Sequence, residues 1–306
     1  MRIRFPKSAF IPATTGVALA VAISLWAQAP GGLTSGQATA PAGGSQNPDT
    51  AKAQGKGRGR GPAVPAGPTP RRPDGKPDLV GIWSSPGPVG DLMQGMPTVP
   101  CDTPGAVPQA AGGRGGRGGQ KAAPTCKEPI PLTAQGEKVW KSQLSKNDPE
   151  ANCLPTGVPR MAPYPWRIVE DPKHIFFLFE GNIHSYRQIF MDGRKHSADP
   201  DPTWYGESIG SWDGDTLVVD TIGYNDKFWF DFAGHPHSEQ LHTIERYTRT
   251  DSASLKIETQ IIDPVMYSKP FTITFTARSQ PGELTEYICQ ENQQDAQHLQ
   301  GPAGLN

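Results

Sequence analysis

Hydrophobic and polar residues alternate along the C-terminal half of the chain. In residues 255–261, leucine, isoleucine and threonine side chains face one way, while lysine, glutamate and glutamine face the other. Residues 271–276 alternate in the same manner. A period of two residues is typical of a β-strand with one buried and one solvated face. The pattern therefore predicts half-buried strands in this part of the chain.

Shorter runs predict more strands. Residues 174–180 are almost entirely apolar, which indicates a strand that is buried on both faces. The dipeptides Asp192-Gly193 and Asp213-Gly214 border such runs and favour tight turns. The other predicted strands span residues 186–191, 207–212, 216–224, 241–250 and 284–290.

One helix is predicted before the strands. Thr133 can cap a segment that ends near Lys146, with Val139, Trp140 and Leu144 as its apolar stripe. A series of short strands joined by tight turns predicts an all-β protein, either an antiparallel barrel or a two-sheet sandwich. We therefore expect an all-β domain with one short helix.

Composition limits how much of the chain folds. The 306 residues include 35 Gly and 33 Pro, which concentrate in residues 30–72 and 102–125. Such segments bury too little apolar surface to offset chain entropy, so we expect both to be disordered. The predicted organisation is a signal peptide at 1–27, a Pro/Gly-rich linker at 28–73, one barrel domain at 74–295 with a disordered insertion at 102–125, and a flexible tail at 296–306.

The N-terminal residues are typical of a secretion signal. Arg2, Arg4 and Lys7 precede a short apolar run at residues 17–26, and Ala27 supplies a small residue for cleavage. An uncleaved membrane anchor over residues 9–29 is the alternative. We expect export, to the periplasm or the medium.

Charge and motifs exclude several partners. A net charge of −1 gives no strong attraction to nucleic acid or to an anionic membrane. The chain has no phosphate-binding loop, dinucleotide-binding glycine motif or nucleophile elbow, so we expect no nucleotide and no redox cofactor. The linker at 28–73 is long enough to reach a partner in the cell envelope.

The four cysteines favour disulfides, because an even number in an exported protein is seldom reactive. They allow three pairings. Cys101 and Cys126 flank the Gly-rich insertion, while Cys153 and Cys289 lie near the two ends of the predicted ordered region. We predict the disulfides Cys101–Cys126 and Cys153–Cys289.

Three of the seven histidines fall within residues 234–242, which makes this segment the main candidate site. In an extended segment His235, His237 and Glu239 point to one side, whereas a helical turn from Ser238 brings Glu239 and His242 to one face. Either arrangement supplies two imidazoles and a carboxylate for a divalent metal ion. The candidate metal ligands are thus His235, His237, Glu239 and His242, although no cofactor is certain.

Two other roles for the segment remain open. In acid–base catalysis, His237 or His242 acts as the base and Asp231 or Glu239 orients it. Alternatively the segment is a polar loop whose histidines hydrogen bond to nearby carbonyl groups. Pro236 biases His235 to an extended conformation in which its side chain can face solvent.

Aromatic residues near this segment predict a ligand pocket. The candidate lining residues are Trp204, Trp212, Tyr224 and Trp229, with Arg187 and Asp226 as polar contacts. The aromatic loop at 224–231 either binds a ligand or folds over the barrel end as a plug. Arg187 either pairs with Glu180 on the preceding strand or contacts a ligand inside a barrel.

Two resemblances extend this interpretation. The sequence Asp78-Leu79-Val80-Gly81-Ile82-Trp83 resembles the G-x-W first-strand signature of lipocalins and related calycins. The resemblance implies that Trp83 closes the barrel floor under an arginine from a late strand, Arg246 or Arg249.

The chain is also similar to a group of exported bacterial β-rich proteins of unknown function. The matching segments are 73–78, 153–155, 205–206, 212–217 and 235–242. This resemblance implies one domain and no particular activity.

The predicted function is binding of a small organic molecule in a calycin-like barrel. The enzymatic version is proton-transfer chemistry, as in a hydratase, lyase, isomerase or hydrolase, with or without a metal ion. The alternative is a non-catalytic structural or interaction protein of the cell envelope.

Overall fold

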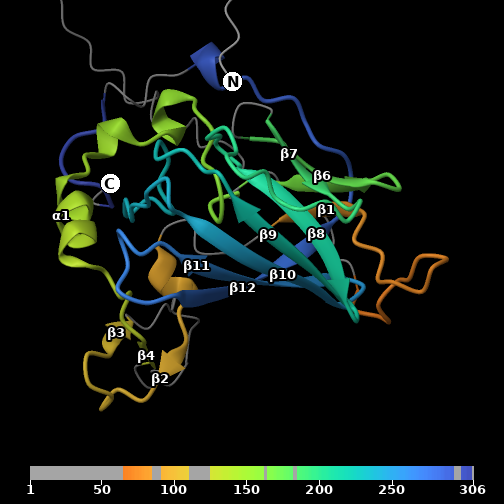
Figure 1. The fold of residues 1–306 in the computed structure, drawn as a ribbon, viewed down its shortest axis with the longest axis horizontal. Coiled ribbons are helices and arrows are strands. Elements are labelled where there is room, and N and C mark those ends of the chain that lie inside the picture. Colours follow the sequence, from red (N-terminus) through yellow and green to blue (C-terminus); the bar gives the residue numbers. More distant parts are fainter. Residues whose placement is uncertain are drawn as a thin grey trace, which may run out of the picture. The chain divides into compact units, whose positions relative to one another are not determined.

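The computed structural model describes residues 65–84, 91–109, 125–161, 164–181, 185–292 and 298–304. Nine strands close into a barrel in the order β1-β12-β11-β10-β9-β8-β7-β6-β5 (Figure 1). They are β1 (Gly81–Ser84), β5 (Trp166–Glu170), β6 (His174–Phe179), β7 (Tyr186–Phe190), β8 (Glu207–Asp213), β9 (Thr216–Ile222), β10 (His242–Asp251), β11 (Ser254–Ile262) and β12 (Phe271–Gln280). The all-β class and the barrel with one short helix are thus confirmed.

A smaller sheet has the order β2-β4-β3, with β2 at Thr98–Val99, β3 at Val107–Gln109 and β4 at Thr125–Lys127. The Cys101–Cys126 disulfide joins β4 to the loop between β2 and β3. Residues 102–109 and 125, within the predicted insertion, therefore belong to this sheet or its loop. Residues 110–124 lie outside the described part of the chain.

Alternating burial along the strands builds the barrel core. In β11, Leu255, Ile257, Thr259 and Ile261 are buried, while the residues between them are partly exposed. The tight turn between β8 and β9 uses Gly214 at a φ of 58°, a conformation that glycine adopts without strain. Period-two alternation thus identified β11 and its inward face.

Two strands differ from the sequence-based prediction. β6 is buried on one face only, because Ile175, Phe177 and Phe179 point inward while Phe176 and Leu178 remain partly exposed. β7 and β8 are parallel, whereas the other neighbouring barrel strands are antiparallel. The connection at residues 191–206 returns the chain to the end from which β7 started.

The helix forms where predicted but is shorter. α1 covers Ala134–Ser142, and the Thr133 hydroxyl accepts a 2.9 Å hydrogen bond from the Gly136 N–H. Gln143 is extended and ends the helix. A Cβ atom at Gly136 would lie 2.2 Å from the Met266 carbonyl oxygen, so glycine permits close contact with the loop before β12. Short 3₁₀ turns follow at Ser145–Asn147 (η2) and Glu150–Asn152 (η3).

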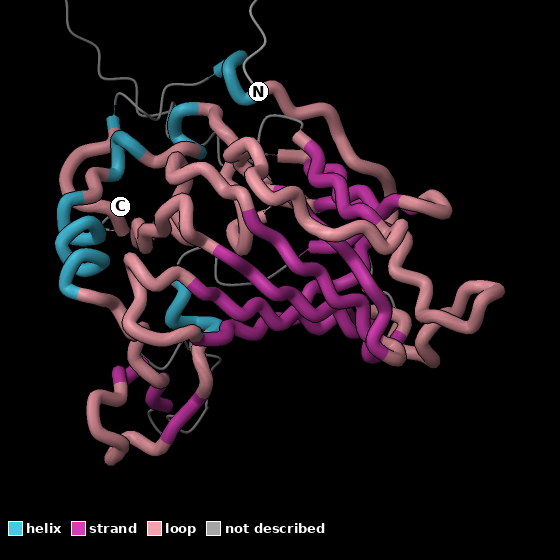
Figure 2. The backbone as a smooth tube through the Cα atoms, in the orientation of Figure 1, coloured by secondary structure: helices cyan, strands magenta, loops and turns pink. Residues whose placement is uncertain are grey.

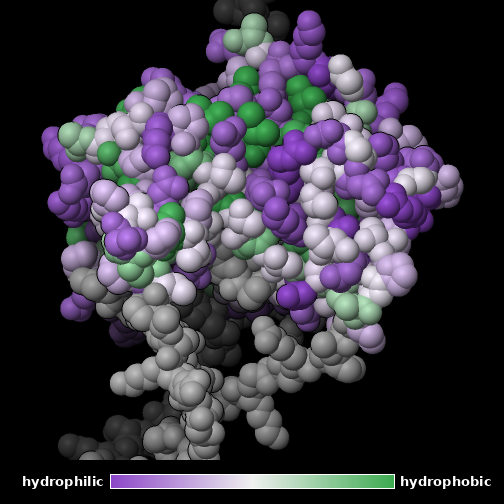
Figure 3. All heavy atoms as spheres, turned by 90° about the horizontal axis from the view of Figure 1, so that it is seen from below, coloured by the Kyte–Doolittle hydropathy of each residue, from purple (hydrophilic) through white to green (hydrophobic). Residues whose placement is uncertain are grey.

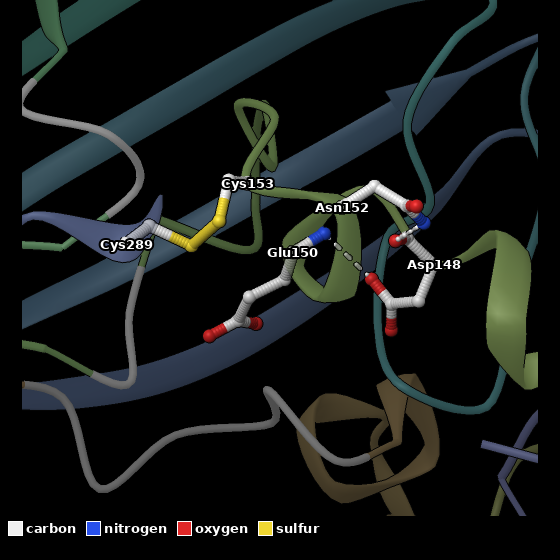
Figure 4. The surroundings of a disulfide bond; sticks show 5 residues. All are labelled: Asp148, Glu150, Asn152, Cys153 and Cys289. Carbon is white, nitrogen blue, oxygen red and sulfur yellow. Dashed lines mark hydrogen bonds between the residues drawn. A yellow bond between two sulfur atoms is a disulfide. The ribbon is translucent and has the colours of Figure 1, made fainter. Parts of the chain in front are cut away.

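The predicted strand at 284–290 is wrong. Residues 281–288 form no strand, and Cys289–Asn292 is a 3₁₀ turn, η5. The reason is that β1 already pairs with β12, so the barrel offers this segment no free edge. Instead, Cys289 is joined to Cys153 beside η3, as Figure 4 shows. Both predicted disulfides are therefore confirmed.

The described chain extends beyond the predicted domain limits. Gly67 in the predicted linker accepts a 3.0 Å hydrogen bond from the Ser252 N–H, and Arg71 forms an ion pair with Asp215. In the predicted tail, Ala303 N–H donates to the Gln143 carbonyl at 3.1 Å. Residues 1–64, which include the predicted signal peptide, lie outside the described residues. None of the helices in the described part is long and apolar enough to cross a membrane.

Helices and long loops gather at the end of the strands where β9 leads into β10 (Figure 2). The view in Figure 3 shows polar and apolar residues mixed over one face, with groups of apolar side chains bordered by polar ones. The loop between β9 and β10, residues 223–241, contains the predicted site segment.

Candidate functional site

The barrel interior contains a buried ion pair between Arg187 of β7 and Glu245 of β10. Both side chains are 0% exposed. The contact is bidentate: Nη1 of Arg187 donates to Oε1 at 3.1 Å and Nη2 donates to Oε2 at 2.5 Å. The expected pairing of Arg187 with Glu180 is thus replaced by a pairing across the barrel. Two-point geometry of this kind makes arginine–carboxylate contacts strong and directional.

Hydroxyl groups complete this network. Arg187 also donates to Ser208 at 3.1 Å and to Thr221 at 2.9 Å, while the Tyr247 hydroxyl donates to Glu245 at 2.6 Å. Burial, followed by the Glu245 carboxylate, raises the pKa of Tyr247 well above its usual range, so this hydroxyl stays protonated. We call Arg187, Ser208, Thr221, Glu245 and Tyr247 the interior network.

Two interior polar atoms have no hydrogen-bond partner among the described residues: Nε1 of Trp166 and Oγ1 of Thr259. Both side chains point inward, and Thr259 lies directly opposite Glu245 in the strand register. The Trp166 ring is 5.1 Å from Phe177 between centroids, and Phe177 is 5.4 Å from Tyr247. Thr259 is thus the neighbour of Glu245 on the adjacent strand, and Trp166 is linked to Tyr247 through the Phe177 ring.

An unpaired buried polar group is costly, by about 1–3 kcal/mol. Native structures contain few of them, and each calls for a physical reason such as a bound molecule. Trp166 and Thr259 together present one N–H donor and one hydroxyl to the interior.

His237 lies in an aromatic cluster in the β9–β10 loop. Its ring centroid is 3.9 Å from that of Phe228 and 5.1 Å from that of Phe230. Nδ1 lies 3.2 Å from the Ser238 carbonyl oxygen, and Nε2 has no partner among the described residues. Burial lowers the pKa of His237 to about 4, so the ring is uncharged at neutral pH.

The same loop covers one end of the barrel. Phe228, Trp229 and Phe230 are at most 6% exposed, so they are not a solvent-facing surface. Tyr224 contacts Phe228 and hydrogen bonds to Thr243 of β10 at 2.8 Å. The geometry matches the plug interpretation of this loop more closely than an open aromatic surface.

His235 is buried, which differs from the expected solvent-facing orientation. Its Nδ1 lies 2.6 Å from Oδ2 of Asp231, and its ring stacks on Trp140 of α1 at 4.7 Å. The Leu92 N–H donates to the same Asp231 oxygen at 2.6 Å. Asp91, beside Leu92, contributes a second carboxylate near the imidazole.

The four predicted metal ligands do not converge. Within the described residues, the one set of three or more potential ligands whose atoms lie within 4.8 Å of one another is Asp91, Asp231 and His235. Glu239 is exposed. His237 is enclosed by phenylalanines, as described above.

His242 lies on the outer wall of the barrel. Its Nε2 is 2.8 Å from Oδ1 of Asp220, which is also 3.1 Å from Nε2 of His196. Nδ1 of His196 is 2.9 Å from a carboxylate oxygen of Glu207. We call His196, Glu207, Asp220 and His242 the outer-wall cluster. Its side chains are 20–45% exposed, so water competes for these contacts.

The predicted pocket residues divide between different parts of the barrel. Arg187 and Tyr224 lie in the interior, and Trp229 is buried in the loop. Trp212 lies under Arg72 at 5.1 Å and Lys76 at 5.9 Å on the outer wall. Trp204 is half-buried and Asp226 is exposed. These six residues therefore do not line one pocket.

Sequence reasoning missed several residues of the interior and the loop. Glu245, Trp166, Tyr247, Thr259 and Asp91 were not identified as site residues. A polar residue at an inward position of an alternating strand is a usable signal for Glu245 and Thr259. No sequence signal marks Asp91, because it reaches His235 only through the fold.

Trp83 is fully buried on β1, and the Arg249 guanidinium lies 4.9 Å from the centre of its ring. Of the two arginines expected near this ring, Arg246 instead pairs with Asp213.

No family model, curated protein or solved structure matches the chain. The site must therefore be interpreted from its own chemistry.

Proposed function

We propose that the protein is exported and binds a small uncharged organic molecule inside the barrel. The observation that carries the proposal is the pair of unpartnered interior atoms, Nε1 of Trp166 and Oγ1 of Thr259. The charged N-terminus, its apolar run and the two disulfides support export, since disulfides persist in oxidising compartments.

The charge balance of the interior favours an uncharged ligand. Arg187 and Glu245 neutralise each other, and their hydrogen bonds are made within the interior network. An anion or cation placed beside them would lose its hydration without gaining a partner. The rings of Phe177 and Tyr247 favour a compact aromatic or cyclic molecule with an oxygen acceptor.

The geometry supports binding better than acid–base catalysis. A pKa of about 4 makes His237 a weak base at neutral pH, and phenylalanine rings surround it. His242 lies on the outer wall with Asp220, away from the inward-facing residues of β10. A hydratase, lyase, isomerase or hydrolase built on these two histidines is therefore not the leading proposal.

Two substitutions test the proposal. Trp166→Phe removes the unpartnered N–H, and Thr259→Val removes the unpartnered hydroxyl at nearly constant volume. Ligands come from a thermal-shift screen of phenols, cyclic ketones and cyclic alcohols. Each variant should bind the compounds found about 3- to 10-fold more weakly, because each loses one hydrogen bond of roughly 1 kcal/mol. Without ligand, Thr259→Val should unfold at the same or a higher temperature.

Thr248→Val is the matched control. Thr248 hydrogen bonds to Thr216 at 2.8 Å on the outer face, so its loss should leave ligand affinity unchanged. If no compound stabilises the protein, or if both interior variants bind as tightly as the wild type, the interior is not a ligand site. A non-catalytic role in the cell envelope is then the remaining function.

A further inference from the structure

We infer that Asp91, Asp231 and His235 form a binding site for one divalent transition-metal ion. This inference is independent of the proposed ligand inside the barrel. Asp91 immediately precedes the 3₁₀ turn η1 (Leu92–Gly95), while Asp231 and His235 belong to the β9–β10 loop. One ligand atom from each residue lies within 4.8 Å of the other two.

The charges of these residues call for a cation. Asp231 is 0% exposed, and its ionic partner among the described residues is His235. No basic side chain of the described residues forms a salt bridge with Asp91. Two carboxylates, of which Asp231 is buried and Asp91 partly buried, thus face one imidazole, and backbone N–H groups of Leu92, Met93 and His235 give only partial compensation. Buried carboxylates are stable when a counter-ion or a metal neutralises them.

The donor set selects the class of ion. Imidazole nitrogen suits zinc, copper, iron and nickel, whereas carboxylate oxygen suits manganese, magnesium and calcium, so a mixed set favours zinc, iron or manganese. Three protein ligands leave at least one coordination position for water or a substrate group. Zn²⁺ and Mn²⁺ are therefore the ions to test first.

The site needs little rearrangement to bind an ion. Metal–ligand bonds of about 2.0–2.2 Å place neighbouring ligand atoms about 3.0–3.5 Å apart, depending on the coordination geometry. The His235–Asp231 contact, now 2.6 Å, must open by roughly 0.5–1 Å, and Asp91 must move closer. Trp140 holds the imidazole in place by stacking on it at an interplanar angle of 16° and donates to the Ala233 carbonyl at 2.7 Å.

Asp91→Asn is the sharpest test, because it removes one charge and one ligand while the turn keeps its cap. Asp91 accepts a hydrogen bond from the Met93 N–H at 2.8 Å, and asparagine caps equally well. The measurement is equilibrium dialysis of the purified chain, without a histidine tag, against Zn²⁺ and Mn²⁺, with metal analysis. We expect one ion per wild-type chain and at least ten-fold weaker binding by Asp91→Asn.

The outer-wall cluster supplies the matched control, since it contains two histidines and two carboxylates. His242→Gln should bind the ion as tightly as the wild type. His235→Gln should bind more weakly than either. Retention of the ion by Asp91→Asn, loss in His242→Gln, or absence of binding by the wild type would each overturn the inference. Melting temperatures measured with and without EDTA show whether each variant is folded.

Discussion

For an individual barrel residue, the strand pattern indicates which face its side chain occupies, but not which residue it contacts. Glu245 lies on the same buried face of β10 as Thr243 and Tyr247, as the alternation of a strand requires. Its partner Arg187 lies on β7, with β8 and β9 between them, so the contact depends on how the sheet curves. The same holds for Asp91 and His235, which are far apart in sequence. Local patterns carry no information about such contacts.

His237 should make the stability of the protein depend on pH. Its pKa is about 4 in the folded protein and about 6.5 in an unfolded chain, because burial disfavours the charged ring. Between these values the unfolded state binds more protons, so stability falls as pH decreases from 6.5 to 4. The contribution lost is up to about 3 kcal/mol.

The measurement is urea unfolding at several pH values. His237→Phe should lose this pH dependence, because phenylalanine does not titrate and fits beside Phe228 and Phe230. Equal slopes for the variant and the wild type between pH 6.5 and 4 would show that other groups control acid unfolding.

At the scale of elements, strand propensity and barrel closure conflict near the C-terminus. Residues 284–290 include Thr285, Tyr287 and Ile288, which favour strands, yet β1 occupies the edge of β12. The segment is held by side chains instead: Glu180 accepts from the Thr285 N–H at 2.8 Å, and Arg167 pairs with Glu283. The disulfide to Cys153 therefore holds this segment against the domain, as backbone hydrogen bonds hold the barrel strands.

The two disulfides should differ in their effect on stability. Cys153 and Cys289 are 136 residues apart, whereas Cys101 and Cys126 are 25 apart. Loop-entropy arguments give about 5 kcal/mol for the longer loop and about 3.5 kcal/mol for the shorter one. Urea unfolding of the two serine double variants tests this order.

Limited proteolysis provides a second measurement on the same variants. Residues 281–292 should be cut readily in the Cys153→Ser/Cys289→Ser protein and remain protected in the Cys101→Ser/Cys126→Ser protein. Protection in both would mean that the ion pair and the hydrogen bond are sufficient to hold the segment.

For the whole molecule, the strands were predictable but their closure was not. The tight turn at Asp213-Gly214 indicated the β8–β9 hairpin, because neighbours in sequence pair locally. Asp192-Gly193, which also favours a tight turn, instead begins the long connection that leads from β7 to the parallel strand β8. The contact between β7 and β8 extends over two residue pairs, Ile189↔Ser208 and Phe190↔Ile209, and is the shortest strand pairing of the described barrel, which we call the seam.

Arg187 reinforces this seam from inside. From β7 it donates to Ser208 on β8, to Thr221 on β9 and to Glu245 on β10. Replacing Arg187 should separate β7 from β8 at the seam. It also leaves Glu245 buried without a counter-charge, which should lower the free energy of unfolding by about 3–5 kcal/mol. In Arg187→Met, amides of β7 and of residues 207–210 should exchange hydrogen before the rest of the barrel.

Arg160→Met is the comparison that separates lost charge from an opened seam. Arg160 is also buried and pairs with Asp148 and Glu150, but its partners lie in η3 and just before it, so it joins no barrel strands. Its loss should lower global stability by a similar amount and release residues 145–161 first, with β7 and β8 still protected. Hydrogen exchange followed by mass spectrometry resolves these segments. If both variants exchange in the same order, Arg187 stabilises the barrel as a whole, and hydrogen bonds of β7 and β8 alone close the seam.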